Sequence, residues 1–478
     1  MRISGDKLHE ECGVFGIASS PGSSLDPTYE TFTGLFSLQH RGQESCGIAV
    51  NDAGVISCHK NLGLVMEVFN APMLQKLKGN SAIGHVRYST TGNASVENAQ
   101  PVAVTHSKGN LAIAHNGNLV NAGELRREIE NQGGIFHSSN DSEIIAYVIV
   151  RERLAAGAIE LAVERAMHQI RGAYSMLVMS PRKLIAARDP NGFRPLSIGM
   201  LDNHYIFASE TCAIDAVGGV FLREVMPGEI AVVEDDVLRS IDTGLRAEKS
   251  FCAFEFIYFA RPDSVLEGIS VDHARQEMGR SLARESGVEA DIVIAVPDSG
   301  ISAAIGYAKE SGIPYGVGLI KNRYIGRTFI QPSQGQRERA VRLKLNPLGA
   351  NVKDKRVIMI DDSIVRGTTS ARIVSALREA GAKEVHMRIS SPPFLHPCYF
   401  GTDVPDSSAL IAHNHTVEET SELIGADSLE YLSNSALLRV LRDAGCSVCD
   451  ACFSGKYPVK PPVETEKNIF EQRIVRMV

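Results

Sequence analysis

Several features that would direct a protein to a membrane, a secretory route or nucleic acid are absent from this sequence. No apolar run approaches the roughly 18 residues that a membrane span requires, and the opening segment 1–11 lacks the apolar core of a secretory signal. The 49 Lys and Arg residues are outnumbered by 56 Asp and Glu residues, and the net charge of −7 disfavours general binding to nucleic acid. Low-complexity tracts and internal repeats are also missing. We therefore expect a cytoplasmic globular protein without membrane or nucleic-acid partners.

The chain of 478 residues is long enough for two or three domains. Short alternating apolar runs mixed with helical stretches fill its first half and predict a layered α+β domain. The polar segment 239–250 lacks periodicity and marks a join. Beyond it, strands alternate with helices, which predicts a parallel α/β sheet. We place the domains at residues 12–245 and 246–478, preceded by the separate segment 1–11.

One stretch of the second half joins four apolar residues, two carboxylates and a loop of small residues. The segment 357–360 predicts a buried parallel strand, and the residues after Thr369 predict a helix that ends at Gly381. Free N–H groups of the loop can hold a phosphate, while Asp361 and Asp362 suit sugar hydroxyls or a hard cation. A simpler interpretation is a turn in which Asp362 caps the helix. No Gly-Lys-Ser/Thr follows the loop, so it differs from a nucleotide P-loop.

Two further segments of the second half are suited to an anionic ligand. The loop Asp298-Ser299-Gly300 follows a strand predicted at 291–296, and its N–H groups suit pyrophosphate, although alone it would be an ordinary turn. The basic segment 321–337 is rich in Gly, Gln and Ser and is long for a connection. It is either a solvated surface loop or a lid that folds over the ligand.

The first half holds four candidates for amide chemistry, each with an ordinary structural alternative. Cys12 alone would be a small buried hydrophobe. Arg87 can clamp a carboxylate with its planar fork or form a surface salt bridge. Asn116-Gly117 follows an apolar strand and is also a strong hairpin signal. Asp141 opens a predicted helix, a position at which any acid is favourable.

Nine cysteines, an odd and unevenly placed set, predict chemistry or metal binding rather than disulfides in a reducing compartment. Cys446, Cys449 and Cys452 stand at CxxCxxC spacing, and Cys252 and Cys398 lie far from them in sequence. Four thiolates suit either zinc or an iron–sulfur cluster. The spacing alone leaves both metals open.

The order of these motifs resembles that of the phosphoribosylpyrophosphate (PRPP) amidotransferases, from residue 12 to the last cysteines. The segment 10–17 (EECGVFGI) resembles the start of class II glutamine amidotransferases, and 361–369 (DDSIVRGTT) resembles the PRPP motif of type I phosphoribosyltransferases. The strings 39–44 (QHRGQE) and 254–264 (FEFIYFARPDS) also match the family, the former without an independent physical interpretation. The cysteines and the opening segment are similar to the branch that carries an iron–sulfur cluster and a propeptide together.

The resemblance implies a four-layer αββα domain of the N-terminal-nucleophile type, followed by a type I phosphoribosyltransferase parallel α/β domain. It implies that residues 1–11 are a propeptide whose removal frees the α-amino group of Cys12. That group has a pKa of about 7.7–8, so it can accept the thiol proton at neutral pH. The resemblance assigns the oxyanion hole to Asn116 and Gly117, and glutamine binding to Arg87 and Asp141.

The second domain receives its ligands by the same resemblance. PRPP binding is assigned to Asp298, Ser299, Gly300, Lys321, Arg327, Asp361, Asp362, Ser363, Arg366, Gly367, Thr368 and Thr369. The implied ligands of Mg²⁺ are Ser299, Asp361 and Asp362. The implied cysteine site is a structural 4Fe-4S cluster on Cys252, Cys398, Cys449 and Cys452.

The implied activity starts purine synthesis: glutamine, PRPP and water give 5-phosphoribosylamine, pyrophosphate and glutamate. Purine nucleotides are implied as inhibitors and a homotetramer as the assembly. Two alternatives remain. Another class II amidotransferase would share the first domain but lack the Asp361-Asp362 loop, and a non-catalytic PRPP-sensing regulator would not need the glutaminase residues around Cys12.

Overall fold

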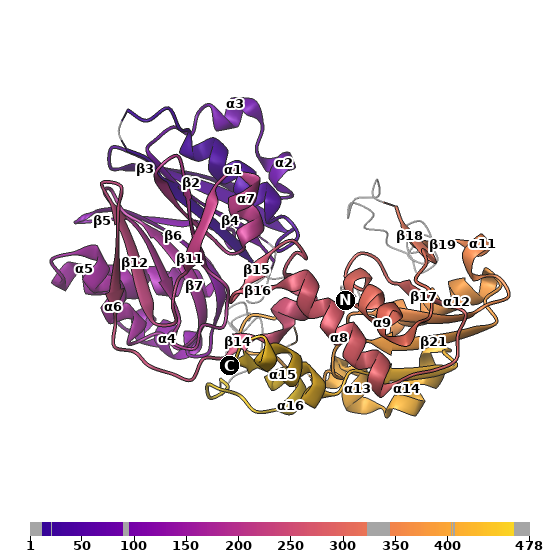
Figure 1. The fold of residues 1–478 in the computed structure, drawn as a ribbon. Helices are drawn as coiled ribbons and strands as arrows, with labels where there is room; N and C mark the ends of the chain where they lie inside the picture. Colours follow the sequence, from indigo (N-terminus) through magenta and orange to yellow (C-terminus); the bar gives the residue numbers. More distant parts are fainter. Residues whose placement is uncertain are drawn as a thin grey trace, which may run out of the picture.

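The computed structural model describes residues 12–20, 22–88, 95–322, 345–402, 404 and 407–462. The predicted propeptide, most of the predicted lid and Arg327 lie outside these residues. Figure 1 shows two bodies side by side, the first half of the chain on the left and most of the second half on the right. Within the described ranges, no helix combines the length and the apolar character that crossing a bilayer needs.

Two antiparallel sheets face each other in the first domain. The seven-stranded sheet has the order β11-β9-β10-β1-β4-β2-β3 and the six-stranded sheet the order β13-β12-β8-β7-β6-β5. The strands of the first sheet are β1 (Gly13–Ala18), β2 (Ser45–Asp52), β3 (Val55–Leu62), β4 (Ser81–Arg87), β9 (Ser197–Leu201), β10 (His204–Ala208) and β11 (Val220–Glu224). Those of the second are β5 (Val102–His106), β6 (Gly109–Leu119), β7 (Gly172–Met179), β8 (Leu184–Arg188), β12 (Glu229–Glu234) and β13 (Val237–Asp242).

Helices cover the outer face of each sheet and complete four layers. The first sheet is covered by α1 (Pro27–Ser37), α2 (Val65–Val68), α3 (Ala71–Leu74) and α7 (Thr211–Ala216). The second is covered by α4 (Ala122–Asn131), α5 (Asp141–Ala155) and α6 (Ile159–Met167). Strand alternation explains the layering: Phe15 and Ile17 pack towards the helices, whereas Val14 between them packs against the opposite sheet. The predicted αββα architecture is confirmed.

The second domain is built on a parallel sheet with the order β17-β20-β21-β22. Its strands are β17 (Ile292–Ala295), β20 (Arg356–Asp361), β21 (Glu384–Ile389) and β22 (Ser428–Tyr431). One face packs with α8 (Val271–Glu285) and α9 (Ile301–Ser311), and the other with α12 (Thr368–Glu379) and α14 (Val417–Ile424). Since both faces are covered, β20 is apolar on both sides, as its run of four apolar residues predicts. The predicted phosphoribosyltransferase-type domain is confirmed.

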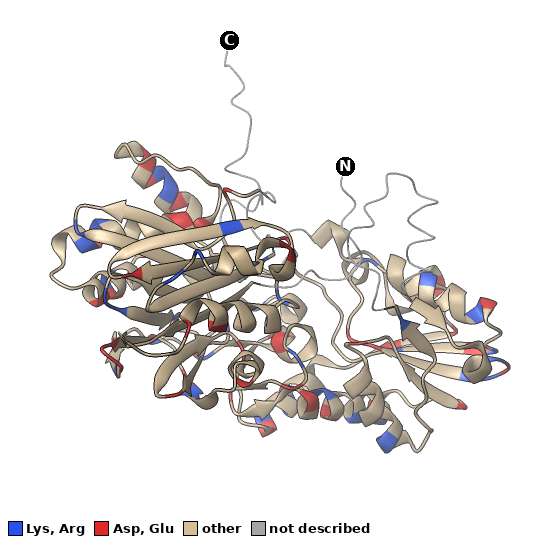
Figure 2. Ribbon diagram, turned by 90° about the horizontal axis from the view of Figure 1, so that it is seen from above, with Lys and Arg blue, Asp and Glu red and all other residues tan. Residues whose placement is uncertain are grey.

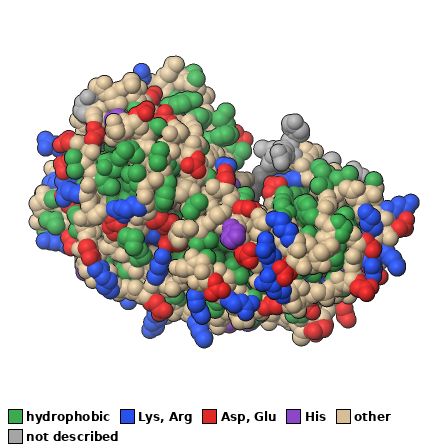
Figure 3. All heavy atoms as spheres, viewed as in Figure 1, with side chains coloured by type: hydrophobic (Ala, Val, Ile, Leu, Met, Phe, Trp, Pro, Cys, Tyr) green, Lys and Arg blue, Asp and Glu red, His purple; other side chains and the backbone are tan. Residues whose placement is uncertain are grey.

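Short elements connect the two domains and complete the second. They are β14 (Phe251–Cys252), the π-helix η1 (Glu255–Phe259), β15 (Val265–Leu266), β16 (Ile269–Ser270), β18 (Leu319–Lys321), β19 (Leu345–Pro347), α11 (Gly349–Val352), η2 (Ser407–Ala409), α13 (Ile411–Asn414), α15 (Asn434–Asp443), β23 (Val448–Cys449) and α16 (Ala451–Ser454). The predicted join overlaps β13, which continues to Asp242 as an exposed edge strand and so has the polar composition of a linker. Figure 2 shows acidic and basic residues interspersed along the ribbon of both bodies, and Figure 3 shows their side chains mixed on the face in view.

Candidate active sites

Cys12 lies at the beginning of β1, where its residue is 7% exposed. Its Sγ is 3.4 Å from the carbonyl oxygen of Tyr88, and its own carbonyl oxygen accepts a hydrogen bond from Arg41 Nε at 3.1 Å. The thiol is therefore buried in a fixed position beside the end of β4. The pairing of β1 with β4, which begins at Gly13, holds Cys12, the candidate nucleophile, in this position.

Arg87 is the last residue of β4 and is 2% exposed. Its Nη1 lies 4.0 Å from Oε2 of Glu44. The alternative of a surface salt bridge is wrong, because the guanidinium is inside the domain. A buried cation with a planar fork is suited to a substrate carboxylate.

Asn116 and Gly117 lie inside β6, which pairs with β5 on one side and β7 on the other. The hairpin alternative is therefore wrong, since long-range sheet pairing replaces the local turn. Gly117 has φ of +148°, and a Cβ there would lie 2.0 Å from the carbonyl oxygen of Ala173, so a side chain is excluded. The Nδ2 donor of Asn116 is buried, and among the described residues no hydrogen-bond partner faces it. An orphaned buried donor is the feature expected of an oxyanion hole.

Asp141 opens α5 and is 5% exposed. Its Oδ2 accepts a hydrogen bond from Leu119 N at 3.0 Å, and its Oδ1 is 3.5 Å from His115 Nδ1. Burial raises the pKa of Asp141, but the His115 charge and hydrogen bond, the Leu119 N–H and Arg87 outweigh it and hold the pKa below its ordinary value. The carboxylate therefore stays charged at neutral pH, as an ammonium-binding group requires.

Three of these side chains project into one space between the two sheets: Cys12, Arg87 and Asn116. Each is an even number of positions from a member of the apolar cluster between the sheets, namely Val14, Ile83 and Ala114 respectively. Because side chains alternate along a strand, they share that face. A cationic clamp, a thiol and a free amide donor thus converge from three strands.

The acidic pair of the second domain lies at the carboxyl end of β20. Asp361 and Asp362 are each 1% exposed. Asp362 accepts hydrogen bonds from the hydroxyls of Ser299 and Ser363, so the two predicted loops meet across β17 and β20. A Cβ on Gly300 would lie 2.5 Å from the carbonyl oxygen of Ile360, which shows how closely the loops approach. The two loops lie next to each other, as predicted.

The helix after the acidic pair is capped by Gly367 with φ of +81°, without a side-chain cap. The alternative in which Asp362 caps this helix is therefore wrong. Thr368 and Thr369 form its first turn, and Arg366 lies exposed just before it. Lys321, at the end of β18, pairs with Asp298 at 2.6 Å across the mouth of the loops. These groups surround the helix N-terminus that the sequence predicts as a phosphate site.

The oxygen atoms of Ser299, Asp361 and Asp362 are a hard donor set that suits Mg²⁺, which takes few protein ligands and completes its shell with water and phosphate. Within the part of the chain that the structure describes, no group of three or more His, Cys, Asp or Glu side chains is arranged to hold a metal ion. The three oxygen donors therefore fit Mg²⁺, but the described residues do not form a complete set of protein ligands for it.

Four cysteines are neighbours at the domain junction. Cys252 and Cys449 are directly paired across the parallel strands β14 and β23, and the carbonyl oxygen of Cys452 accepts hydrogen bonds from Leu395 N and His396 N, both at 3.0 Å. Burial, and then Cys398, Cys252 and Cys449, raise the pKa of Cys452 well above its ordinary value. These thiols lie near one another, although among the described residues they are not set as metal ligands.

Cys446 is evenly spaced from Cys449 but is not one of these four cysteines. Burial raises its pKa to about 12, and the charges acting on it come from Glu267, Lys249, Glu224 and Arg188. Cys446 belongs to the same apolar cluster against which Cys252, Cys398 and Cys452 pack.

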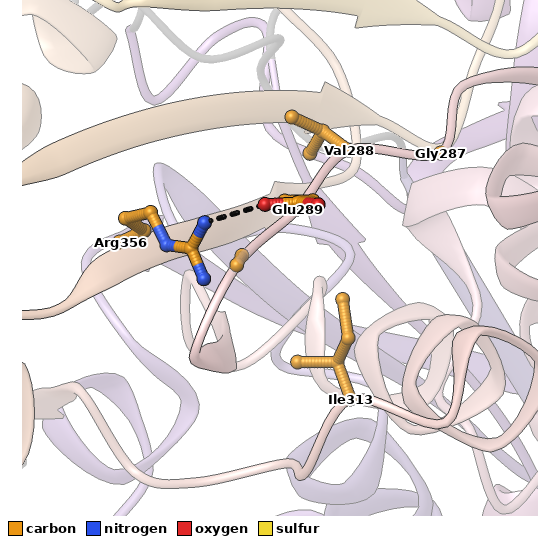
Figure 4. Close-up of a pocket in the computed structure, with 6 residues that line it drawn as sticks. Gly287, Val288, Glu289, Ile313 and Arg356 are labelled. Atoms are coloured by element: carbon orange, nitrogen blue, oxygen red, sulfur yellow. Dashed lines mark hydrogen bonds and ion pairs between the residues drawn. The ribbon is translucent and has the colours of Figure 1, made fainter.

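A pocket of about 510 Å³ lies at the opposite end of the strands from the acidic pair (Figure 4). It is lined by Gly287, Val288, Glu289, Ala290, Ile313 and Arg356. Arg356 points towards Glu289, and the two form an ion pair at 2.9 Å. Arg356 begins β20 whereas Asp361 ends it, so this pocket is at the amino ends of the strands. Ligands of open α/β sheets bind at the carboxyl ends, and the pocket is not part of either site.

Sequence reasoning missed several buried groups around both sites: His115, Arg41, Glu210, Glu255 and Arg275. All five are at most 4% exposed. Two of them stand in the strings 39–44 and 254–264, which match the family without a full interpretation. A charged residue inside an otherwise apolar run is the signal that could have singled out Glu255, which stands in the run 254–259 (FEFIYF).

A glutaminase-type site and a phosphoribosyl-type site in one chain define a glutamine amidotransferase joined to a phosphoribosyltransferase. Family models agree: a glutamine amidotransferase domain matches residues 85–216, and a phosphoribosyl transferase domain matches residues 274–390.

Whole-chain comparisons name the family. The chain is 52% identical over 458 residues to the amidophosphoribosyltransferase of Bacillus subtilis, covering 95% of each chain. It is 53% identical over 455 residues to that of Archaeoglobus fulgidus, covering 95% of this chain and 99% of the relative. A solved structure of glutamine PRPP amidotransferase from B. subtilis, complexed with ADP and GMP, matches with a TM-score of 0.89 at 50% identity, covering 95% of this chain and 99% of that one.

The chain therefore belongs to the amidophosphoribosyltransferase family. It is a glutamine-dependent phosphoribosyltransferase with glutamine and PRPP as substrates. This confirms the predicted activity and excludes the two alternative classes as descriptions of the whole chain.

Proposed function

We propose that residues 12–245 hydrolyse glutamine at Cys12 and that residues 246–478 add the released ammonia to PRPP at the Asp361-Asp362 edge. Water and glutamine give glutamate and ammonia, and ammonia displaces pyrophosphate to give 5-phosphoribosylamine. The observation that carries the first half is the buried Nδ2 of Asn116, which has no partner in the described residues. A buried donor without a partner is costly, so its retention points to a substrate oxyanion.

In this proposal, removal of residues 1–11 gives Cys12 a free α-amino group that accepts the thiol proton. The thiolate attacks the glutamine amide carbon, and Asn116 Nδ2 with the Gly117 N–H stabilises the oxyanion. Arg87 binds the substrate carboxylate and Asp141 its ammonium group. A cation and an anion clamp together select a free α-amino acid.

The proposed PRPP site uses the loop 298–300 for pyrophosphate and the loop 363–369 for the 5′-phosphate, with Asp361 and Asp362 on the ribose hydroxyls. Lys321 and Arg366 supply positive charge, and Arg327 belongs to the same assignment although it is outside the described residues. When bound by Ser299, Asp361 and Asp362, Mg²⁺ supplies charge neutralisation for the departing pyrophosphate. The neighbouring loops then position the anomeric carbon for ammonia.

We further propose a structural 4Fe-4S cluster on Cys252, Cys398, Cys449 and Cys452. Support comes from their proximity and from the contacts of this region with the first domain, where Phe400 stacks on Phe193 with 4.4 Å between ring centroids. Four thiolates are the usual ligands of such a cluster. Iron with labile sulfide in the purified brown protein is the expected result, and stoichiometric zinc without iron would exclude the cluster.

Regulation and assembly complete the proposal. Because the B. subtilis structure is complexed with ADP and GMP, we propose that purine nucleotides inhibit this enzyme by binding at the loop 361–369, in a cytoplasmic homotetramer that starts purine synthesis. Competition between a purine nucleotide and PRPP in steady-state kinetics tests the shared loop, and light scattering tests the assembly.

The decisive experiment for the division of labour is Cys12→Ala. Glutamine-dependent synthesis should vanish while ammonia-dependent synthesis persists. Retention of glutamine-dependent turnover, or loss of both activities in a folded protein, contradicts the proposal. Active enzyme whose intact mass still includes residues 1–11 contradicts the propeptide.

A further inference from the structure

A fully buried ion pair joins the two domains beside the glutaminase site. Arg41 follows α1 in the first domain, and Glu255 begins η1 in the second. Arg41 Nη2 donates to Glu255 Oε1 at 2.6 Å, and Nη1 donates to Oε2 at 2.9 Å. Neither side chain is exposed. This bidentate arrangement fixes both the distance and the plane of the two groups.

The third side of the same guanidinium faces the nucleophile. Arg41 Nε donates to the carbonyl oxygen of Cys12 at 3.1 Å, so a residue of the second domain is two hydrogen bonds away from the peptide group of Cys12. Since the guanidinium is planar and rigid, a displacement of Glu255 is passed to Cys12.

Glu210 is a second partner of Arg41: Arg41 Nη1 also donates to Glu210 Oε1 at 2.6 Å. It also accepts hydrogen bonds from Ser264 Oγ at 2.7 Å and Arg261 N at 2.9 Å, both in the second domain. Burial raises the pKa of Glu210, but His40 and Arg41 outweigh it and hold the pKa far below its ordinary value. Arg41 is therefore held between two charged carboxylates.

Glu255 is the first residue of the π-helix η1, which fixes its backbone in the second domain. Its carbonyl oxygen accepts from Ala260 N at 3.1 Å, and the carbonyl oxygens of Phe256 and Ala260 accept from Arg275 of α8 at 2.7 and 2.8 Å. Single π-helical turns occur frequently at functional sites. Burial lowers the pKa of Arg275 to about 10, and the strongest opposing charge is that of Asp362. The helix is thus tied to Arg41 through Glu255 and to α8 through Arg275.

We propose that Glu255 is a positioning residue of the glutaminase site: through Arg41 it holds the peptide group of Cys12, and through η1 that hold depends on the packing against α8. The proposal rests on the proposed role of Cys12. It gives the strings 39–44 and 254–264 a joint function, since each supplies one partner of the pair. The first domain alone lacks this part of its active site.

The test is Glu255→Gln, which keeps the shape of the side chain and removes its charge. The kcat of glutamine hydrolysis should fall about 10²-fold, as expected for a displaced nucleophile. The KM for glutamine and the ammonia-dependent rate should stay within about twofold, because neither Arg87, Asp141 nor the PRPP loops are changed. Glu255→Asp, which keeps the charge on a shorter side chain, should show a smaller loss of the same kind.

The chain offers a matched control. Arg188 of the first domain pairs with Glu267 of the second at 2.7 Å, and their side chains are 1% and 7% exposed. Glu267→Gln therefore removes another buried interdomain charge, one that pairs with Arg188 and Lys249 and not with Arg41. It should lower the melting temperature about as much as Glu255→Gln does, without changing the ratio of glutamine-dependent to ammonia-dependent rates.

Three outcomes overturn the proposal: equal loss of both rates in Glu255→Gln, no loss of either, or the same selective loss in Glu267→Gln. A double variant with Arg41→Lys should lose less than the two single losses combined, because both changes break the contact between Arg41 and Glu255. Failure of the proposed function is distinguishable, since Cys12→Ala would then retain glutamine hydrolysis whatever the behaviour of Glu255.

Discussion

The two sites of this enzyme are built in opposite ways. The residues proposed for the glutaminase site come from strands and from the start of helix α5, far apart in sequence, and they are buried: Arg87 and Asp141 are 2% and 5% exposed. The PRPP residues come from two contiguous loops at the open edge of a sheet. There the charged groups that face solvent, Lys321 and Asp298, are 35% and 59% exposed and neutralise each other.

This difference follows from the ligands. Glutamine is a small zwitterion, and the proposed site offers it one buried cation, one buried anion and an amide donor without a partner among the described residues. PRPP is large and highly anionic, and the site proposed for it offers backbone N–H groups of two loops to its phosphates. In the proposed PRPP site the ligand would replace the pair formed by Lys321 and Asp298.

The largest effect should come from the acidic pair, because the proposed function assigns both the ribose and the metal to Asp362. In Asp362→Asn, synthesis from glutamine and from ammonia should both fall about 10³-fold, comparable to losing a central electrostatic group. Glutamine hydrolysis measured without PRPP should persist. Ser375→Ala, on the exposed face of α12, is the control and should leave all three rates unchanged. Loss of PRPP-free glutaminase in Asp362→Asn would show that the two sites are not separable.

Removal of the free donor should affect only the first site. Asn116→Ala should lower the kcat of glutamine hydrolysis about 10²- to 10³-fold with little change in KM, because the donor acts on the oxyanion and not on the bound amide. Asn110→Ala, at the start of the same strand, loses a hydrogen bond to Gly54 O and serves as the control. A rise in KM with unchanged kcat would instead make Asn116 a substrate-binding residue.

The same contrast explains how far the sequence alone could lead. The strand, acidic pair, loop and helix at 357–380 are contiguous, so local patterns predict their arrangement. Asn116-Gly117 shows the limit: the local signal favours a hairpin, but pairing of β6 with two neighbours overrides it. Arg41 and Glu255 are 214 positions apart, and neither spacing nor periodicity can indicate that they meet. A site made of contiguous loops is predictable from sequence, whereas a network made by folding is not.

A smaller effect is expected from Asp141, with a defined pH dependence. Its pKa is held below the ordinary value, so the carboxylate is charged at neutral pH and remains charged as the pH falls towards 5. Binding of the glutamine ammonium group should therefore be constant from about pH 8 to about pH 5 and weaken only below the usual carboxyl pKa of about 4. Calorimetric titration of Cys12→Ala with glutamine measures this without turnover. Asp141→Asn should weaken binding about 10- to 100-fold throughout this range, and weakening that begins near pH 6 would contradict the assignment.

The smallest effect should come from the pocket at the amino ends of the strands. Glu289 is 91% exposed in its ion pair with Arg356, and exposed pairs contribute little to stability. Glu289→Ala should leave the glutamine-dependent and ammonia-dependent rates within about twofold of the wild type, with PRPP affinity unchanged. The reason is geometric, because four residues of β20 separate Arg356, which lines the pocket, from Asp361. A selective loss of PRPP affinity in Glu289→Ala would mean that the second site extends through the sheet, and the contrast between a closed first site and an open-edged second site would no longer hold.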